Sequence, residues 1–255
     1  MRLLLTNDDG ADALGLVTLA GVLGEVHEVF VVAPDREQSA SGHAISVRRP
    51  ISVEPDPEAG PSQHYRVGGT PADCVKLALE RLLPGRPDLI LSGINHGTNL
   101  GRDVFYSGTV SAAVEGVFQG VPAVALSSES TDPAVLRWIA RFVCRWIEGP
   151  HLPPPPGVLY NVNFPAFNGR TGEPRQLAWV RLGRREYRNR FERRMGPDGR
   201  PAYWLLGQPW DRLGEVDTDV DALAQGFVTV TPIHTDITHY PVLAHKPERE
   251  TIAGE

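Results

Sequence analysis

Short apolar runs alternate with amphipathic windows along the first half of this chain. Four runs have the length and composition of buried strands: residues 2–6, 28–35, 87–95 and 121–127. Four windows repeat apolar residues at helical spacing: residues 13–24, 70–82, 108–119 and 132–148. This alternation is typical of βαβ units, so the predicted fold class is α/β, with a mostly parallel sheet flanked by helices.

Four more runs are predicted to be strands. Residues 45–54 and 64–69 read as shorter strands, and because no helix separates them we expect an antiparallel pair. Further strands are predicted at 158–165 and 226–238. The predicted sheet is therefore large and has antiparallel additions.

Residues 166–215 lose the alternation and hold many arginines and glycines. They predict an extended hairpin, or arm, that projects from the core, and we expect one α/β domain over residues 1–255 that includes it. The arm concentrates apolar side chains at Tyr203, Trp204, Leu205 and Leu206. Such a cluster is too apolar for an exposed hairpin, so we expect a homodimer or a larger oligomer.

Composition excludes several classes of protein. The formal net charge of -6 argues against a general nucleic-acid coat. No apolar stretch is long enough to span a membrane, and the N-terminus shows no signal-peptide pattern, so we expect a cytoplasmic protein without a membrane partner. Two cysteines, Cys74 and Cys144, form no CxxC motif and imply neither a disulfide nor zinc.

Polar clusters follow the predicted strands or open the predicted helices. They occupy residues 7–10, 35–44, 92–101 and 106–113. Ligands of parallel sheets bind beyond the carboxyl ends of the strands, where such loops gather. We therefore expect these four clusters to form one site.

Asp8 and Asp9 are adjacent carboxylates at the end of the first strand. One interpretation is an Asx turn that caps the following helix. The other is a site for a hard divalent cation, Mg²⁺ or Mn²⁺, which prefers carboxylate and neutral oxygen ligands. Their position at a strand end favours the cation.

Ser107, Gly108 and Thr109 stand where a helix begins. Free backbone amides and the helix dipole favour a phosphate there, although a plain Ser/Thr cap is the alternative. The glycine-rich loop at 92–101 permits a close approach to a ligand. Neither stretch matches a dinucleotide or Walker motif, so those functions are disfavoured.

Seven motifs, in order along nearly the whole chain, resemble the SurE family of survival-protein acid phosphatases, also described as 5'/3'-nucleotidases. They are LLLTNDDG, VVAPDREQSASG, GTPADCV, PDLILSGINHGTNLG, YSGTVSAAVEG, NVNFP and GFVTVTP. The resemblance is weakest over 166–215. It implies a Rossmann-like core, a metal-dependent phosphatase acting on nucleoside monophosphates, and homodimers or homotetramers built through an exchanged C-terminal arm.

The resemblance also implies residue roles and one divalent metal ion per subunit. The implied metal ligands are Asp8, Asp9, Ser39 and Asn95. The implied phosphate contacts are Asn95, Ser107, Gly108 and Thr109. Ser41 is a rival to Ser39 as a metal ligand, because both serines lie in the same loop.

The hypothesis for the reaction is direct attack by water on the phosphate monoester. A divalent ion lowers the pKa of water, and Asp9 is the preferred proton acceptor. His43 and His96 lie in the right loops to protonate the leaving group. A covalent aspartyl-phosphate route is disfavoured because it prefers carboxylates two residues apart, and these are adjacent.

The alternative function is a non-enzymatic nucleotide or RNA binder. It is motivated by seven arginines within residues 181–194. Glu186 and Glu192 interrupt this run, which favours a solvated or subunit-bridging arm. A nucleic-acid partner is therefore the less favoured prediction.

Overall fold

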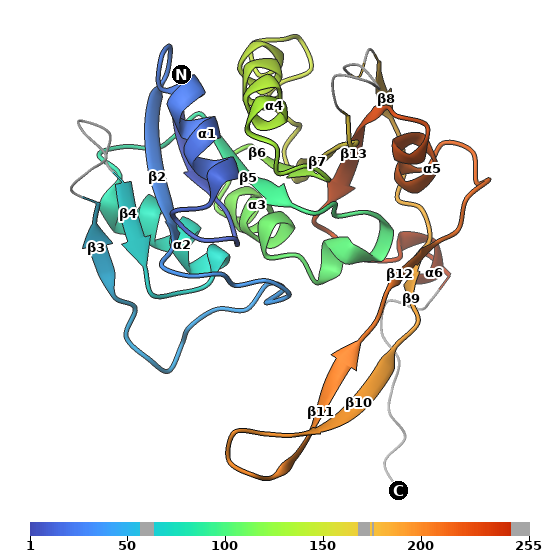
Figure 1. The fold of residues 1–255 in the computed structure, drawn as a ribbon. Coiled ribbons are helices and arrows are strands. Elements are labelled where there is room, and N and C mark those ends of the chain that lie inside the picture. The colour runs from blue at the N-terminus through green and yellow to red at the C-terminus, as the bar shows by residue number, and fades with distance from the viewer. Residues whose placement is uncertain (57–63, 168–173, 175, 246–255) are drawn as a thin grey trace, which may run out of the picture.

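The computed structural model describes residues 1–56, 64–167, 174 and 176–245. Parallel strands form the centre of its main sheet (Figure 1). They are β1 (Arg2–Thr6), β2 (Glu28–Pro34), β5 (Leu89–His96), β6 (Ala123–Ser128) and β7 (Val158–Phe164). Each pairs in parallel with its neighbour in the order β2-β1-β5-β6-β7, which confirms the predicted α/β class.

Four further strands extend the two edges of this sheet. The added strands are β3 (Val53–Pro55), β4 (His64–Val67), β13 (Val228–His234) and β8 (Leu177–Trp179). β4 is parallel to β2, and β8 is parallel to β13. β3 is antiparallel to β4, as predicted, and β13 is antiparallel to β7. Across the described residues the strand order is β3-β4-β2-β1-β5-β6-β7-β13-β8.

The predicted strand at 45–54 is wrong in extent, because only Val53–Pro55 pair as a strand. Residues 44–46 are held by side chains near the start of α2 (Pro71–Leu77), and not by strand-to-strand hydrogen bonds. The Ser46 N–H donates to Asp73 Oδ1 (2.9 Å), and the Thr70 hydroxyl donates to the Ala44 carbonyl (2.7 Å). Pro50 also lacks the N–H that a strand interior requires.

Helices cover both faces of the sheet. On one face lie α1 (Leu14–Leu23) and α4 (Pro133–Trp146). On the other lie α2 (Pro71–Leu77), its π-helical continuation η1 (Ala78–Leu82), and α3 (Gly108–Phe118). The predicted capping box of α2 is present, with Thr70 and Asp73 bonded reciprocally.

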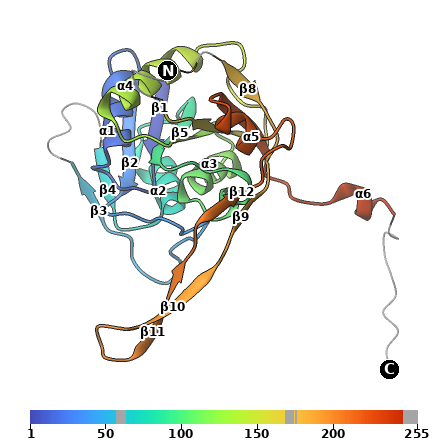
Figure 2. The same ribbon diagram turned by 45° about the vertical axis from the view of Figure 1, so that its right-hand side comes forward.

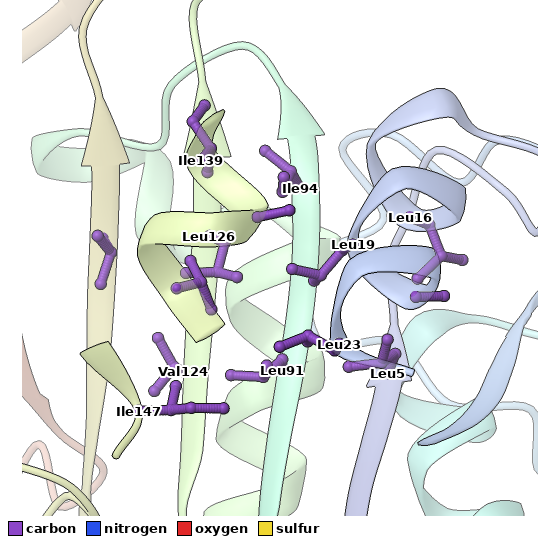
Figure 3. Packing of buried hydrophobic residues seen from close by; sticks show 14 of the residues in the cluster. Leu5, Leu16, Leu19, Leu23, Leu91, Ile94, Val124, Leu126, Ile139 and Ile147 are labelled. Carbon is purple, nitrogen blue, oxygen red and sulfur yellow. The ribbon is translucent and has the colours of Figure 1, made fainter. Parts of the chain in front are cut away.

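Strand alternation divides the core between these two faces. In β1, Leu3 and Leu5 pack toward α1 and α4, whereas Leu4 packs toward α2 and α3. Figure 3 shows the first layer, where leucines of α1 meet Leu91 and Ile94 of β5. Close-packed apolar side chains dominate both layers and hold the sheet between the helices.

The arm is a long two-stranded projection (Figure 2). Its base pairs β9 (Arg185–Tyr187) with β12 (Pro209–Asp211), and its tip pairs β10 (Arg190–Met195) with β11 (Pro201–Leu206), both antiparallel. The extended hairpin expected within 166–215 is thus confirmed, apart from residues 168–173 and 175, which lie outside the described residues.

Three short helices complete the described chain: η2 (Gly101–Phe105), α5 (Asp219–Ala224) and α6 (Tyr240–Leu243). α5 was not among the predicted helices. α6 stands away from the body of the molecule (Figure 2). Among the described residues, no helix combines the length and hydropathy needed to cross a bilayer.

The strand order reverses at β1. The chain proceeds from β1 to β2 on one side, and later returns to place β5 on the other side. Open α/β sheets bind ligands at such a switch point, outside the carboxyl ends of the strands. Residues just after β1 and at the end of β5 are therefore neighbours at the expected place for a site.

Candidate active site

A tight turn after β1 presents Asp8 and Asp9. The Asn7 side chain closes it, donating from Nδ2 to the Gly10 carbonyl (2.8 Å) and accepting the Gly10 N–H at Oδ1 (3.2 Å). Gly10 has φ +106°, a conformation that favours glycine. Helix α1 has Ala13 at its N-cap and no side-chain cap, so the helix-capping interpretation of the two aspartates is wrong.

Asp8 is buried against the start of α3. Its carboxylate accepts a hydrogen bond from the Thr109 hydroxyl. Burial raises the pKa of Asp8 to about 6, since the Thr109 bond only partly offsets desolvation and the charge of Asp9 adds to it. A Cβ at Gly108 would lie 2.7 Å from the Asp8 Cβ, so this approach requires glycine.

Asp9 points toward the end of β5. Its Oδ2 accepts the backbone N–H of His96 (3.0 Å). Burial raises the pKa of Asp9, and the contacts with His96 oppose that rise. Within the described part of the chain, neither Asp8 nor Asp9 forms an ion pair with lysine or arginine. Two adjacent carboxylates without a cationic partner fit a divalent cation.

The loop after β2 is tied to this turn, because the Gln38 N–H donates to the Asp8 carbonyl (2.7 Å). Ser39 is exposed, and its hydroxyl donates to Glu37 Oε1 (2.6 Å). The hydroxyl of the rival, Ser41, is buried and has no hydrogen-bond partner among the described residues. Of these two serines, Ser39 is the one that lines the same cavity as Asp8.

Asn95 lies at the end of β5, after an irregularity in the pairing with β6. Gly93 there has φ +135°, and a Cβ on it would lie 2.2 Å from the Leu126 carbonyl oxygen. The Asn95 Nδ2 donates to the Gly97 carbonyl (2.7 Å). This bond leaves the side-chain oxygen as the atom of Asn95 available to a cation.

Ser107, Gly108 and Thr109 begin α3 as predicted. The Ser107 hydroxyl accepts the Val110 N–H (3.1 Å) and is therefore the N-cap. The Thr109 hydroxyl is directed to Asp8. The Val110 N–H is taken by Ser107 and the Thr109 N–H by Asp8, so among the described residues the Gly108 N–H is the first-turn donor left for an anion, and the phosphate role of the three residues stays a prediction.

A cavity of about 640 Å³ opens beside these residues. The predicted site residues that line it are Asp8, Ser39, Asn95, His96 and Ser107. Asp9 lines an adjoining cavity of about 200 Å³, and Asn95 and His96 line both. Gly108, Thr109 and His43 line neither of the two.

The two histidines predicted as proton donors lie in different surroundings. His43 Nε2 lies 3.0 Å from Glu115 Oε2, and its ring stacks on Phe118 at 5.5 Å. His43 thus packs against α3, whereas His96 borders the cavity. Of the two, His96 is the one placed to reach a leaving group.

The family model of the Survival protein SurE matches residues 3–189 of this chain. The chain belongs to the SurE family. A protein named 5'-nucleotidase SurE from Pelotomaculum thermopropionicum is 45% identical over 246 residues, covering 95% of this chain and 93% of that protein. Another of the same name, from Synechococcus elongatus, is 45% identical over 259 residues, covering 96% and 97%.

The similarity extends to a solved structure. The crystal structure of the SurE protein from Aquifex aeolicus matches with a TM-score of 0.80 and 36% identity, covering 96% of this chain and 97% of that one. The resemblance to SurE, and the α/β sheet expected from it, are confirmed.

In this SurE-family chain, several cavity residues were not named individually from sequence. Thr98, Asn99 and Tyr106 lie within the predicted polar clusters, whereas Arg102, Asp103, Arg185 and Tyr187 lie outside them. Asn99 could have been found through the NVNFP motif, because Asn161 and Asn163 both donate to its carbonyl (2.7 and 3.2 Å). Arg185 had no comparable signal, since it stands among other arginines.

Proposed function

We propose that this chain is a phosphatase of the 5'-nucleotidase type, hydrolysing nucleoside monophosphates by direct attack of water. The observation that carries the proposal is the carboxylate pair, Asp8 buried and Asp9 half-buried, which has no cationic side-chain partner among the described residues and whose Asp8 lines a cavity of about 640 Å³. That volume is in the range of small-molecule sites. Relatives named 5'-nucleotidase align over almost the entire chain, which supports the same assignment.

One divalent ion per subunit, Mg²⁺ or Mn²⁺, is part of the proposal. The residues that would hold it are Asp8, Asp9, Ser39 and Asn95, all of which offer oxygen. This donor set suits a hard cation, and the two carboxylates would balance its charge. When bound, such an ion would supply positive charge to the phosphate and acidify nearby water.

The chain's own residues would perform the remaining steps. The Gly108 N–H at the start of α3 would hold a phosphate oxygen, next to Ser107, which caps that turn and lines the cavity. Asp9 accepts the proton of the attacking water. His96 donates a proton to the nucleoside oxygen as the phosphorus–oxygen bond breaks. The products are inorganic phosphate and a nucleoside.

Phosphate release from AMP, with EDTA or with added Mg²⁺ or Mn²⁺, tests this function. We expect EDTA to abolish release and the added ion to restore it. Asp8→Asn should lower kcat by about a hundredfold or more, the scale on which one preorganised group contributes. Its matched control is Asp12→Asn, because Asp12 is an exposed partner of Arg66 outside both cavities.

Binding of Mn²⁺, measured by calorimetry, gives a second readout. Asp8→Asn should weaken binding, and Asp12→Asn should leave it unchanged. Phosphate release that is indifferent both to EDTA and to Asp8→Asn would contradict the proposal.

We further propose that the protein acts in the cytoplasm as a homodimer or homotetramer, without membrane or nucleic-acid partners.

A further inference from the structure

The arm forms one wall of the larger cavity. The arm residues that line it are Arg185, Glu186, Tyr187, Asn189, Leu205 and Gly207. Asp8, Ser39 and Ser107 line it from the body of the molecule. The arm is thus a separate element that shares the cavity with the segment carrying Asp8.

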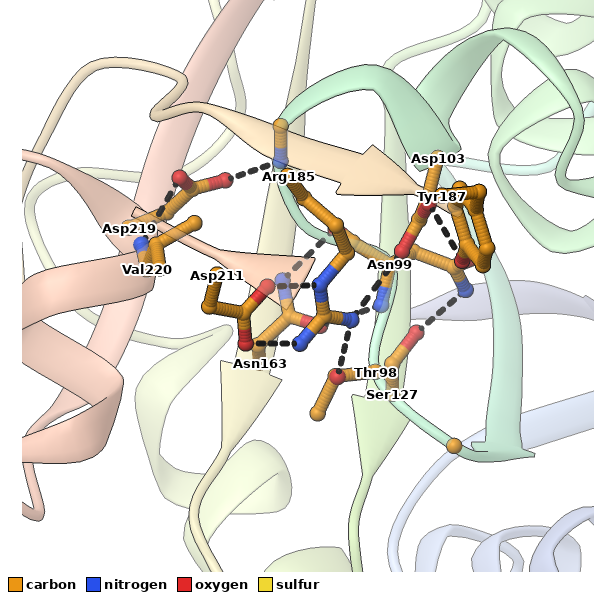
Figure 4. A network of polar contacts seen from close by, with 12 residues as sticks. Thr98, Asn99, Asp103, Ser127, Asn163, Arg185, Tyr187, Asp211, Asp219 and Val220 are labelled. Carbon is orange, nitrogen blue, oxygen red and sulfur yellow. Dashed lines mark hydrogen bonds and ion pairs between the residues drawn. The ribbon is translucent and has the colours of Figure 1, made fainter. Parts of the chain in front are cut away.

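Arg185 connects this wall to the body (Figure 4). Its residue exposure is 8%, so its charge is almost fully buried. Nε and Nη2 donate to the two oxygens of Asp211 (2.6 and 2.8 Å), within the arm. Nη1 donates to Asp103 Oδ2 (3.0 Å) and to Thr98 Oγ1 (3.1 Å), both on the body. One guanidinium therefore joins β12 to the segment that follows β5.

Tyr187 makes a second connection to the same carboxylate. Its hydroxyl donates to Asp103 Oδ1 (2.7 Å), so both oxygens of Asp103 are bound from the arm. Burial and this bond raise the pKa of Tyr187 to about 12. The Asp103 carbonyl in turn accepts the Ser107 N–H (2.9 Å). The arm is thus connected to the start of α3 through one residue, Asp103, which is hydrogen-bonded to both.

The base of the arm also lies unusually close to this segment. Asp219 accepts the Gly101 N–H at Oδ2 (2.9 Å) and the Gly183 N–H at Oδ1 (2.6 Å). Gly101 has φ +51°, and a Cβ on it would lie 2.7 Å from the Gly183 carbonyl oxygen. The contact between arm and body is therefore specified by backbone as well as by side chains.

The groups that the arm offers to the cavity differ from those of the carboxylate end. Tyr187 and Leu205 supply aromatic and aliphatic surface, and Asn189 supplies an amide. Such a mixture suits a nucleoside, whose base and ribose are flat, partly apolar and hydrogen-bonding. The proposed phosphate contacts lie instead on the body, at the start of α3.

We propose that Arg185 is a positioning residue that holds the arm against residues 98–103, and thereby sets the affinity for the nucleoside part of the substrate. The inference rests on the proposed function. Arg185 acts through the wall it fixes, and the chemistry at the phosphate belongs to other residues. Its loss would weaken substrate binding more than it slows the reaction step.

The test compares two substrates in two variants. Arg185→Met removes the connection, and Arg184→Met is the matched control, because Arg184 is exposed and its one ion pair within the described residues is with Glu215 (3.4 Å). AMP carries a nucleoside, and glycerol 2-phosphate does not. For Arg185→Met we expect KM for AMP to rise about tenfold or more with kcat little changed, as when uniform binding is lost. Both constants for glycerol 2-phosphate should stay within about threefold, and Arg184→Met should match wild type.

Removing a buried ion-pair partner can prevent folding. Tyr187→Phe therefore accompanies Arg185→Met, because it deletes one hydroxyl and keeps the ring. It should raise KM for AMP selectively, by a smaller factor. If the folded variants lose both substrates equally, or neither, the inference is overturned while the nucleotidase function stands. If wild type releases no phosphate from AMP, the proposed function fails first, and this inference with it.

Discussion

Individual side chains near Asp8 show how closely the site is packed. Asp8 is held by the Thr109 hydroxyl, and Gly108 lies against it with no room for a methyl group. The glycine of this motif therefore serves packing as well as the helix start. A free amide alone would have tolerated alanine.

Gly108→Ala tests this packing. Its Cβ would lie 2.7 Å from the Asp8 Cβ, so the aspartate or the helix must move. We expect a loss of about 1–3 kcal/mol in the free energy of unfolding, as for overpacking. kcat/KM for AMP should fall by about a hundredfold, the cost of a displacement near 1 Å.

Gly21→Ala is the control for that substitution. Gly21 lies in α1 with nothing within 4 Å of the added Cβ. Alanine there should stabilise the protein by about 0.5–1 kcal/mol and leave activity unchanged. Equal activity for the two alanine variants, measured beside their thermal unfolding, would show that the contact with Asp8 is unimportant.

Helix α3 serves two loops at once. Its first turn faces Asp8, and farther along it Glu115 receives the loop that carries Ser39, through His43. Glu115 also accepts hydrogen bonds from Lys76 (3.0 Å) and Gln119 (2.8 Å). Burial alone would raise the pKa of Glu115, but these bonds outweigh it and bring the pKa to about 2.

This depressed pKa predicts a pH-dependent stability. The carboxylate stabilises the fold above its unfolded pKa of 4.5, and this contribution is lost as pH falls toward 2. At pH 7, Glu115→Gln should lower the free energy of unfolding by about 1–3 kcal/mol. The difference from wild type should shrink by pH 3, in denaturant titrations at both values. Exposed Glu80→Gln should show no difference at either pH, and a gap for Glu115→Gln that is constant with pH would contradict the prediction.

Elements whose cause is local could be predicted from sequence, and those fixed by distant contacts could not. The capping box at Thr70 and Asp73 and the turn at 7–10 are written in neighbouring residues. The sequence of residues 45–52 favours a strand. The segment is a loop because Asp73, from another element, binds the Ser46 N–H.

The same holds for the site. Asp8 and Ser39 follow strands and Asn95 lies at the end of one, so strand polarity brings them to one edge. The partners of the buried Arg185 are distant in the chain: Asp103 lies 82 residues before it and Asp211 lies 26 residues after it. Its neighbour Arg184 is the same residue type in the same arginine-rich segment, yet it is exposed.

At the scale of the molecule, the arm is more than a basic extension. Arg181 and Arg184 pair with Glu215, and Arg194 pairs with Glu192, so much of its charge is compensated. The RNA-binding alternative is weakened by this pairing, though it stays untested. The tip instead exposes large apolar side chains on both strands: Phe191, Met195, Tyr203, Trp204 and Leu205.

Such a surface on a projecting hairpin predicts self-association. We expect light scattering at micromolar concentration to give a dimer or a larger species. Trp204→Glu should shift it toward a smaller one. Leu213→Glu, at an exposed leucine outside the hairpin strands, is the control and should leave the mass unchanged. A monomeric wild-type protein would rule out this expectation.

The rim of the sheet where the parallel strands begin lies opposite the rim that carries the candidate site. Because β2, β5 and β6 all run parallel to β1, the turns at 24–27, 84–88 and 119–122 gather where these strands start. They take no part in either cavity. Affinity tags, fluorophores or surface tethers placed in those turns should leave turnover intact, which makes that rim the natural handle for immobilising the protein.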